Sequence, residues 1–193
     1  IRRRHRVSAD QDAAWTDYWA RHGAGPSGCL PGRASPLEQA TRAVWTRVAG
    51  KLRRGASVLD LATGDGAVLL MLRAARLDLK LTGIDSARKL PRAPAGVMER
   101  LPFPDRRFDL VTSQFGIEYG DVAAAAAEAS RVLRPGGQLV LLVHHAGGPV
   151  VAHNRARALA LQWVLEQAGY WERARSFAAS RALGPLPVPA FFA

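Results

Sequence analysis

The stretch from Val58 to Gly66, which reads VLDLATGDG, constrains the fold of this chain more than any other part of the sequence. Strand-forming residues lead into an acid, a turn holds two glycines one residue apart, and the apolar run Ala67 to Leu72 follows. This order predicts a strand, a tight loop and a helix. The glycines let a ligand approach the backbone, and the start of the helix offers unpaired N–H groups. We therefore expect a nucleotide-like ligand at this loop.

A second acid strengthens this short glycine pattern. The stretch Lys80 to Asp85 is the second expected strand, and Asp85 follows Gly66 by 19 residues. An acid about 20 residues beyond such a loop is placed to hold ribose hydroxyls. The strict dinucleotide pattern fails, however, because Leu69 stands where that pattern has its last small residue. NAD is therefore the second choice of ligand.

Composition limits the classes of function. The 193 residues suffice for one α/β domain, and no apolar stretch reaches the roughly 18 residues that a membrane span needs. The single cysteine, Cys29, excludes an internal disulfide and a thiolate metal cluster, and no secretory signal is visible. We therefore expect a cytoplasmic protein without a metal site.

The net charge of +11 raises the question of a nucleic-acid partner. Of the 27 basic residues, 24 are arginine, and their scatter among many alanines is typical of compositional bias. The one local cluster, Arg2 to Arg6, lies at the terminus, where a solvated tail is the commoner explanation. The charge therefore does not favour nucleic acid, and the sequence leaves the oligomeric state open.

Residues 1–33 are expected to form an N-terminal cap or lid segment that contains a loop from Gly23 to Gly32. Trp15, Tyr18 and Trp19 fall at helical spacing and would form one apolar stripe. Two interpretations stay open. The stripe docks a short helix on the core, which we favour, or it covers the ligand pocket.

The main domain is expected over residues 34–170, with a C-terminal tail over residues 171–193. Its first helix begins where Ser35 can cap it, and we expect the apolar face of this helix to lie against the sheet. That face consists of Leu37, Ala40, Val44 and Val48.

The second half of the domain alternates strands and helices. The stretch from residue 86 to residue 103 is rich in proline and holds a short helix at most, so an edge strand there is vestigial or the chain skips residues. A central strand begins near Phe108, and Asp121 caps the next helix. Arg134 to Gly137 then turns the chain into the apolar strand Gln138 to Val143, which suits the buried middle of a parallel sheet.

In this order, the motifs resemble those of the class I S-adenosylmethionine-dependent methyltransferases, and within them the ubiquinone/menaquinone C-methyltransferase branch. The resemblance covers roughly residues 34 to 170. It implies an α/β fold with a doubly wound, mainly parallel, Rossmann-like sheet flanked by helices. It also implies S-adenosyl-L-methionine as cofactor and a small-molecule acceptor, methylated on carbon or oxygen. The residues that carry the resemblance are Leu59 to Gly66, Asp85, Leu101 to Phe103, Phe108 to Val111 and Arg134 to Gly137.

The resemblance implies how the methionine half of the cofactor is held. Asp60 would lie beneath its amino group. Ser113 and Gln114 match the family position near that amino group, and Phe115 would line the cleft. The residues that would wrap the methionine half are Ala62, Thr63, Gly64 and Gly66.

The adenosine half would lie against the next strand end. By the same resemblance, Asp85 would take both ribose hydroxyls and Ser86 would flank the sugar, while Met98 and Glu99 would border adenine. Val97 stands where the family has an acid for the adenine amino group, and this departure lowers the expected selectivity for adenine.

A second departure concerns the end of the sheet. The family normally closes its sheet with an antiparallel hairpin, but only proline-rich residues follow Gly169. We therefore expect five strands or fewer and no such hairpin. Two alternatives to a small-molecule methyltransferase follow: a non-catalytic cofactor-binding remnant, and an RNA methyltransferase suggested by the charge.

His144 and His145 are the candidate catalytic residues. They follow the last expected strand near the mouth of the cleft, and histidine suits a base near neutral pH if the acceptor must lose a proton. The other interpretation is that one histidine caps the strand end and the other is solvated.

Overall fold

The computed structural model of this chain describes residues 9–22, 35–87, 96–166 and 169–181. The chain divides into two compact units, Ile1–Val143 and His144–Ala193. The predicted loop at Gly23 to Gly32, the Arg2 to Arg6 cluster and Cys29 lie outside the described residues. None of the helices in the described part is long and apolar enough to cross a membrane.

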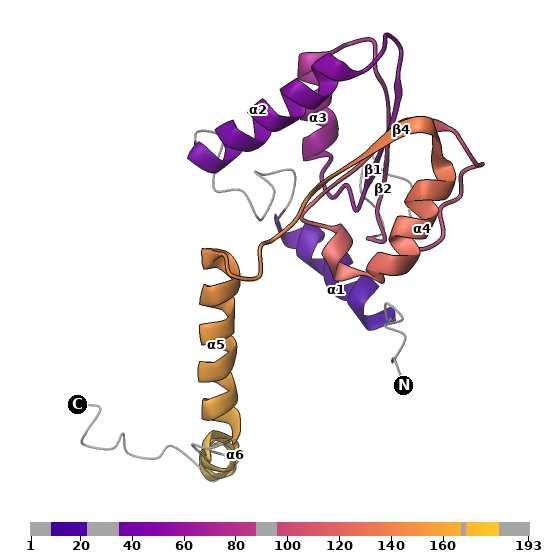
Figure 1. The fold of residues 1–193 in the computed structure, drawn as a ribbon. Coiled ribbons are helices and arrows are strands. Elements are labelled where there is room, and N and C mark those ends of the chain that lie inside the picture. Colours follow the sequence, from indigo (N-terminus) through magenta and orange to yellow (C-terminus); the bar gives the residue numbers. More distant parts are fainter. Residues whose placement is uncertain (1–8, 23–34, 88–95, 167–168, 182–193) are drawn as a thin grey trace. The chain divides into compact units, whose positions relative to one another are not determined.

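A four-stranded sheet forms the centre of the first unit (Figure 1). All strand pairs are parallel, and the strand order is β2-β1-β3-β4. Asp60 near the end of β1 pairs with Gly83 on one side and with Thr112 on the other, so the carboxyl ends of three strands meet at one edge. The strands are β1 (Ser57–Leu61), β2 (Lys80–Ile84), β3 (Phe108–Gln114) and β4 (Leu133–Leu142).

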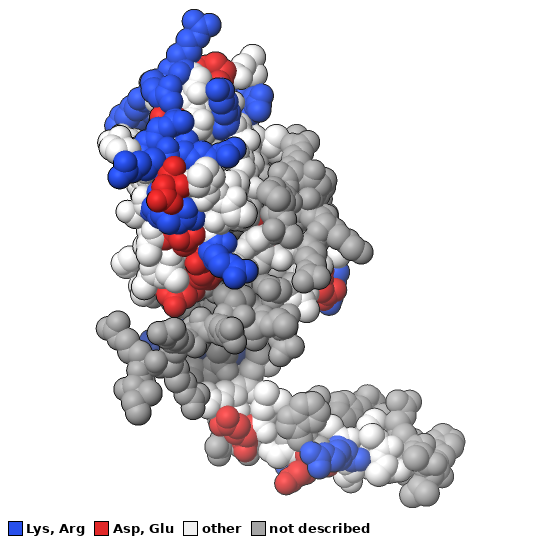
Figure 2. Space-filling model, turned by 90° about the vertical axis from the view of Figure 1, so that its right-hand side faces the viewer, with Lys and Arg blue, Asp and Glu red and all other residues white. Residues whose placement is uncertain are grey.

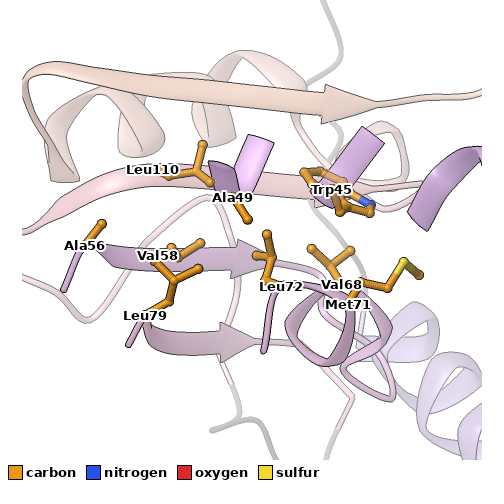
Figure 3. Close-up of a cluster of buried hydrophobic side chains, with 9 residues drawn as sticks. All are labelled: Trp45, Ala49, Ala56, Val58, Val68, Met71, Leu72, Leu79 and Leu110. Atoms are coloured by element: carbon orange, nitrogen blue, oxygen red, sulfur yellow. The ribbon is translucent and has the colours of Figure 1, made fainter. Parts of the chain in front are cut away.

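Helices cover both faces of this sheet, which confirms the predicted doubly wound α/β class. Figure 3 shows the cluster on one face, where α2 and α3 pack on Val58 of β1 and Leu110 of β3. On the other face, α4 packs on Leu59 and Val111. The helices of the unit are α1 (Ala9–His22), α2 (Pro36–Lys51), α3 (Ala67–Ala75), η1 (Ile117–Tyr119) and α4 (Val122–Val132).

The predicted first helix is confirmed as α2, but only part of its predicted apolar face lies inward: Val48 packs on the core, whereas Leu37 and Ala40 are exposed. The Ser35 side chain caps it by accepting a hydrogen bond from the Glu38 N–H at 3.1 Å. Leu37, which was expected against the sheet, is 41% exposed, whereas Trp45 is fully buried. Burial of this one large indole removes more apolar surface from water than burial of the smaller residues opposite. The helix is therefore rotated to bury Glu38, Thr41, Trp45 and Ala49.

The last strand, β4, differs from its prediction in two ways. It begins at Leu133, directly after α4, and the expected turn from Arg134 to Gly137 is a bulge inside the strand, opposite the step from Phe108 to Leu110 of β3. The strand was expected in the middle of the sheet, but among the described residues it lies at the edge. Leu139 is accordingly 40% exposed. No strand follows β4 in the described part of the chain, and its four strands agree with the expected five or fewer.

The proline-rich stretch holds neither a helix nor a strand over residues 96–103, and residues 88–95 lie outside the described part. The second unit contains the helix α5 (Pro149–Glu166). The predicted tail contains α6 (Tyr170–Arg181) in its described portion. The predicted domain boundaries at residues 33 and 170 stay predictions.

Basic side chains gather over the upper part of the first unit (Figure 2). In Figure 1, β1 begins at this upper end. Asp60 and Asp85 lie at the opposite end, where β1 and β2 finish. The described cations that precede or begin the strands and are exposed include Arg53, Arg54, Lys80, Arg106 and Arg107.

Asp109 in β3 holds three neighbours at that end. Its carboxylate accepts hydrogen bonds from the Ser57 N–H at 2.7 Å, from Arg53 at 2.8 and 3.0 Å, and from Arg134 at 2.6 Å. Burial opposes ionisation, but these three donors outweigh it and hold the pKa of Asp109 below its ordinary value. The carboxylate therefore joins the starts of β1 and β4 to β3.

We expect Asp109→Asn to lower the free energy of unfolding near neutral pH by about 1–2 kcal/mol, because an amide cannot accept from all three donors. The native pKa is depressed, so this contribution is present above the ordinary value of 3.8 and is lost as the pH falls through the native pKa. Urea unfolding at a series of pH values measures it. Asp105→Asn, at a side chain that is 69% exposed, is the matched control and should change stability little.

Candidate functional site

Two adjoining cavities lie at the carboxyl edge of the sheet. The first has an empty volume of about 610 Å³ and the second about 870 Å³, and both volumes include space that is open to solvent. The first is lined by Asp85, Ser86, Met98 and Glu99, which are the residues expected at the adenosine half. The second is lined by residues expected at the methionine half: Asp60, Thr63, Gly64 and Gln114.

Both cavities share a wall that is mostly aromatic. Its described members are Trp15, Trp19, Ala62, Phe115 and Tyr119. The expected cofactor residues are therefore split into two sets that face a common wall, as a ligand with two different halves requires.

The backbone of the glycine loop turns through left-handed conformations. Gly64 has φ +52° and Gly66 has φ +84°. A Cβ at position 64 would lie 2.5 Å from the Trp19 indole, so the ring rests directly on this glycine. Ala62 also has a positive φ of 50°, as does Phe115 at 54°. Such conformations cost about 1–2 kcal/mol in a residue with a side chain, and strain of this kind gathers at functional sites.

Asp60 is buried at the end of β1 and is held by two hydroxyl groups. Thr63 Oγ1 donates to Oδ2 at 2.7 Å, and Thr112 Oγ1 donates to Oδ1 at 2.8 Å. Burial raises the pKa of Asp60 to about 7; the two hydroxyls oppose this shift and the charge of Asp85 adds to it. Asp60 therefore changes charge near neutral pH at the wall of the second cavity.

Asp85 connects the glycine loop to the end of β2. Its Oδ2 accepts from the Gly64 N–H and its Oδ1 accepts from the Ala87 N–H, both at 2.8 Å. These two bonds hold the Asp85 carboxylate at the wall of the first cavity, between the glycine loop and the end of β2. The geometry fits the role that the resemblance implies for Asp85, which stays a prediction.

The part of the first cavity that was expected to border adenine is lined by apolar side chains and by Glu99, which already accepts a hydrogen bond from the protein. Val97 and Met98 line it, and Glu99 Oε1 accepts from the Asp121 N–H at 3.0 Å. Glu99 therefore fixes the start of α4. It does not replace the missing acid at position 97, so adenine would be recognised mainly by shape and by backbone groups.

The aromatic residues of α1 line the cavities. We favoured packing on the core for the stripe of Trp15, Tyr18 and Trp19, and that preference was wrong. Trp15 packs edge-to-face on Tyr119 of η1 with ring centroids 5.1 Å apart, and Trp19 rests on Gly64. Helical periodicity identified the stripe but not the surface that it covers.

Two expected cofactor residues do not line either cavity. Ser113 is fully buried; its hydroxyl donates to the Leu61 carbonyl at 3.0 Å and accepts from the Ile117 N–H at 3.1 Å. Gly66 is the residue that precedes α3, and its N–H donates to the Thr63 carbonyl. Both residues shape the strand exit and the loop, and their predicted cofactor contacts stay predictions.

Sequence reasoning missed one residue beneath the site. The Trp45 Nε1–H donates to Gln114 Oε1 at 2.7 Å, although the two residues are 69 positions apart. Its helical position gave no signal for this contact, because the expected face of α2 excluded it. His144 and His145 open the second unit, and their predicted role as bases stays a prediction.

Comparison with known proteins finds a domain match in the middle of the chain. A family model described as a methyltransferase domain matches residues 59–141. A demethylmenaquinone methyltransferase of Mycolicibacterium paratuberculosis is 39% identical over 104 residues, which cover 50% of this chain and 45% of the relative. The chain therefore spans under half the length of this curated relative.

Solved structures agree on the fold. The YcgJ protein of Bacillus subtilis superposes with a TM-score of 0.51 at 26% identity, over 60% of this chain and 55% of that protein. The [4+2]-cyclase SpnF superposes with a TM-score of 0.54 at 24% identity, over 74% of this chain and 62% of that protein. The second likeness concerns the fold alone.

We expect the stability of the wild type to carry a pH dependence that Asp60→Asn removes. The raised pKa of about 7 means that the folded protein keeps a proton that the unfolded chain releases above its ordinary value of 3.8. The contribution of Asp60 to the free energy of unfolding therefore falls between about pH 4 and pH 7 and is constant above. The fall is about 1 kcal/mol per pH unit. Urea unfolding of wild type and Asp60→Asn across this range measures the difference.

Asp105→Asn serves as the control because its carboxylate is exposed and lies away from the site. It should keep the wild-type slope between pH 4 and pH 7. Equal slopes for wild type and Asp60→Asn would contradict a raised pKa.

Proposed function

We propose that this chain, whose residues 59–141 match a model described as a methyltransferase domain, transfers a methyl group from S-adenosyl-L-methionine to carbon or oxygen of a small, flat, largely apolar acceptor. One observation carries the proposal. Most of the residues that the resemblance assigns to the two halves of the cofactor line two adjoining cavities, which share one wall.

The residues present fit S-adenosyl-L-methionine. The Asp85 carboxylate lines the first cavity, where ribose hydroxyls need an acceptor, and the carboxylates of Asp60 and Asp65 line the second cavity, where an ammonium group needs acceptors. Ala62 and Phe115 line both cavities and lie where the sulfur would join the two halves. The fit is weakest at adenine, because Val97 offers no acceptor there.

When bound, the cofactor supplies an activated methyl group with a good leaving group. The protein's contribution is then to align the acceptor and to exclude water, which can account for most of the acceleration. Trp15, Trp19 and Tyr119 form the apolar wall that does both. A base is needed only if the acceptor loses a proton, and His144 or His145 is proposed for that step.

The proposed acceptor is a hydroxylated aromatic ring such as a quinol. The aromatic wall supports this, since flat rings stack favourably on Trp and Tyr. A relative named for demethylmenaquinone supports the same class. A cytoplasmic setting is part of the proposal.

An RNA acceptor is less well supported. The exposed cations that precede or begin the strands lie at the opposite end of the sheet, and among the described residues neither cavity is lined by Lys, Arg or His. Nucleic-acid sites need cations beside the reacting base to hold phosphates.

We expect S-adenosylhomocysteine to bind the wild-type chain in isothermal titration calorimetry and Asp85→Ala to weaken binding at least about fivefold. The variant loses charge-assisted hydrogen bonds to ribose. Asp78→Ala, at an acid paired with Arg76 beyond α3, is the matched control and should bind like the wild type. No binding by the wild type would refute the proposed function, and unchanged affinity in Asp85→Ala would refute the ribose site.

We expect Trp15→Ala to impair the acceptor more than the cofactor. Transfer of labelled methyl groups to demethylmenaquinol should show a KM for the acceptor raised by about tenfold, because an aromatic stacking surface is lost. The affinity for S-adenosylhomocysteine should change less than about threefold. Trp15→Phe keeps a ring and should retain most of the activity. An equal loss in both ligands would contradict an acceptor site at this wall.

A further inference from the structure

The side-chain amide of Gln114 is held in one orientation by Trp45. An indole N–H can only donate a hydrogen bond, so the atom that it contacts must be the amide oxygen. The Nε1 to Oε1 distance is 2.7 Å, and the indole is fully buried in the core between α2 and the sheet. The orientation of the amide is therefore set by packing of the core.

With its oxygen engaged, Gln114 presents its NH₂ group as a donor. Gln114 lines the second cavity together with Thr63, Gly64 and Asp65. None of the hydrogen bonds among the described residues uses Gln114 Nε2. The group therefore offers N–H donors at the cavity expected to hold the methionine half of the cofactor.

The side-chain donors that line this cavity are neutral: they belong to Trp15, Tyr18, Trp19, Thr63, Gln114 and Tyr119. Among its described lining residues there is no Lys, Arg or His, while Asp60 and Asp65 contribute acceptors. The loop was expected to offer free N–H groups, but several are engaged within the protein. Those that already donate to protein acceptors include the N–H groups of Thr63, Gly64, Gly66 and Ala67.

An amino-acid end group brings both charges into this space. Its ammonium can be matched by the carboxylates of Asp60 and Asp65, but its carboxylate needs donors that are neither cations nor the engaged loop groups. Gln114 Nε2 supplies such donors.

We propose that Gln114 binds the carboxylate of the cofactor's methionine portion through Nε2, and that Trp45 is the positioning residue that keeps the amide in this orientation. The proposal rests on the proposed function. It departs from the role near the amino group that the resemblance implies for Gln114. Trp45 takes one of the two acceptor positions of the amide oxygen, whereas no hydrogen bond among the described residues uses the N–H donors of Nε2.

The test compares two ligands by isothermal titration calorimetry. One is S-adenosylhomocysteine, and the other is 5′-deoxy-5′-(3-aminopropylthio)adenosine, which keeps the amino group but lacks the carboxylate. Gln114→Leu should weaken S-adenosylhomocysteine about tenfold and leave the decarboxylated ligand unchanged. Gln114→Glu keeps an acceptor for Trp45 but turns a negative charge to the carboxylate, so it should weaken S-adenosylhomocysteine further while the decarboxylated ligand still binds.

Trp45→Phe tests the positioning role, because it keeps an aromatic ring and removes only the donor. It should weaken S-adenosylhomocysteine about threefold in the wild-type background and should have no further effect in Gln114→Leu. A merely structural role would lower both affinities in both backgrounds. Gln138→Leu is the matched control, since Gln138 is exposed on β4 and pairs with Leu110, four residues before Gln114.

The outcomes separate this proposal from the proposed function. No binding of S-adenosylhomocysteine by the wild type refutes the function and this proposal with it. Wild-type binding that Gln114→Leu leaves unchanged, or an equal loss for both ligands, refutes only the carboxylate contact. The melting temperatures of the variants identify any that fail to fold, and Gln114→Glu then decides, since it retains the bond to Trp45.

Discussion

Two buried carboxylates hold the carboxyl edge of the sheet together. Asp60 accepts from Thr63 in the loop and from Thr112 in β3, and Asp85 accepts from the Gly64 N–H across the gap between β1 and β2. Buried acids are costly unless donors surround them, so the loop and both neighbouring strands must keep these positions. Both cavities are defined by the backbone that these bonds fix. The pKa of Asp60 is raised because this arrangement buries its carboxyl group.

Trp45 connects the hydrophobic core to the same edge. Its ring fills the space between α2 and the sheet (Figure 3). Its N–H donates to Gln114 at the exit of β3. A buried indole needs a partner for its N–H, and a glutamine at the strand exit provides one. Core packing thereby determines which atoms of Gln114 remain for a ligand, so a residue without contact to either cavity shapes the chemistry of one.

The wall shared by the cavities comes from parts of the chain that are far apart in sequence. Helix α1 contributes Trp15 and Trp19, and the segment after β3 contributes Phe115 and Tyr119. Trp19 rests on Gly64, and Trp15 packs on Tyr119. The left-handed backbone at Phe115 turns the chain at the end of β3 and so places its ring on this wall. An apolar wall of this kind excludes water and suits a flat acceptor beside a reactive methyl group.

The sequence by itself determined the parallel α/β sheet, the glycine loop after β1 and the acid at the end of β2, because these follow from local patterns of strand, turn and cap. The residues expected at the cofactor came from the family resemblance, and most of them line the two cavities because parallel strands bring their carboxyl ends to one edge. Only the tertiary structure decided the rotation of α2, the edge position of β4, the use of the aromatic stripe of α1 and the orientation of Gln114. Each of these depends on what a side chain meets across the fold: Trp45 meets Gln114 over 69 positions, and Trp19 meets Gly64. Periodicity within one helix or strand contains no information about such partners.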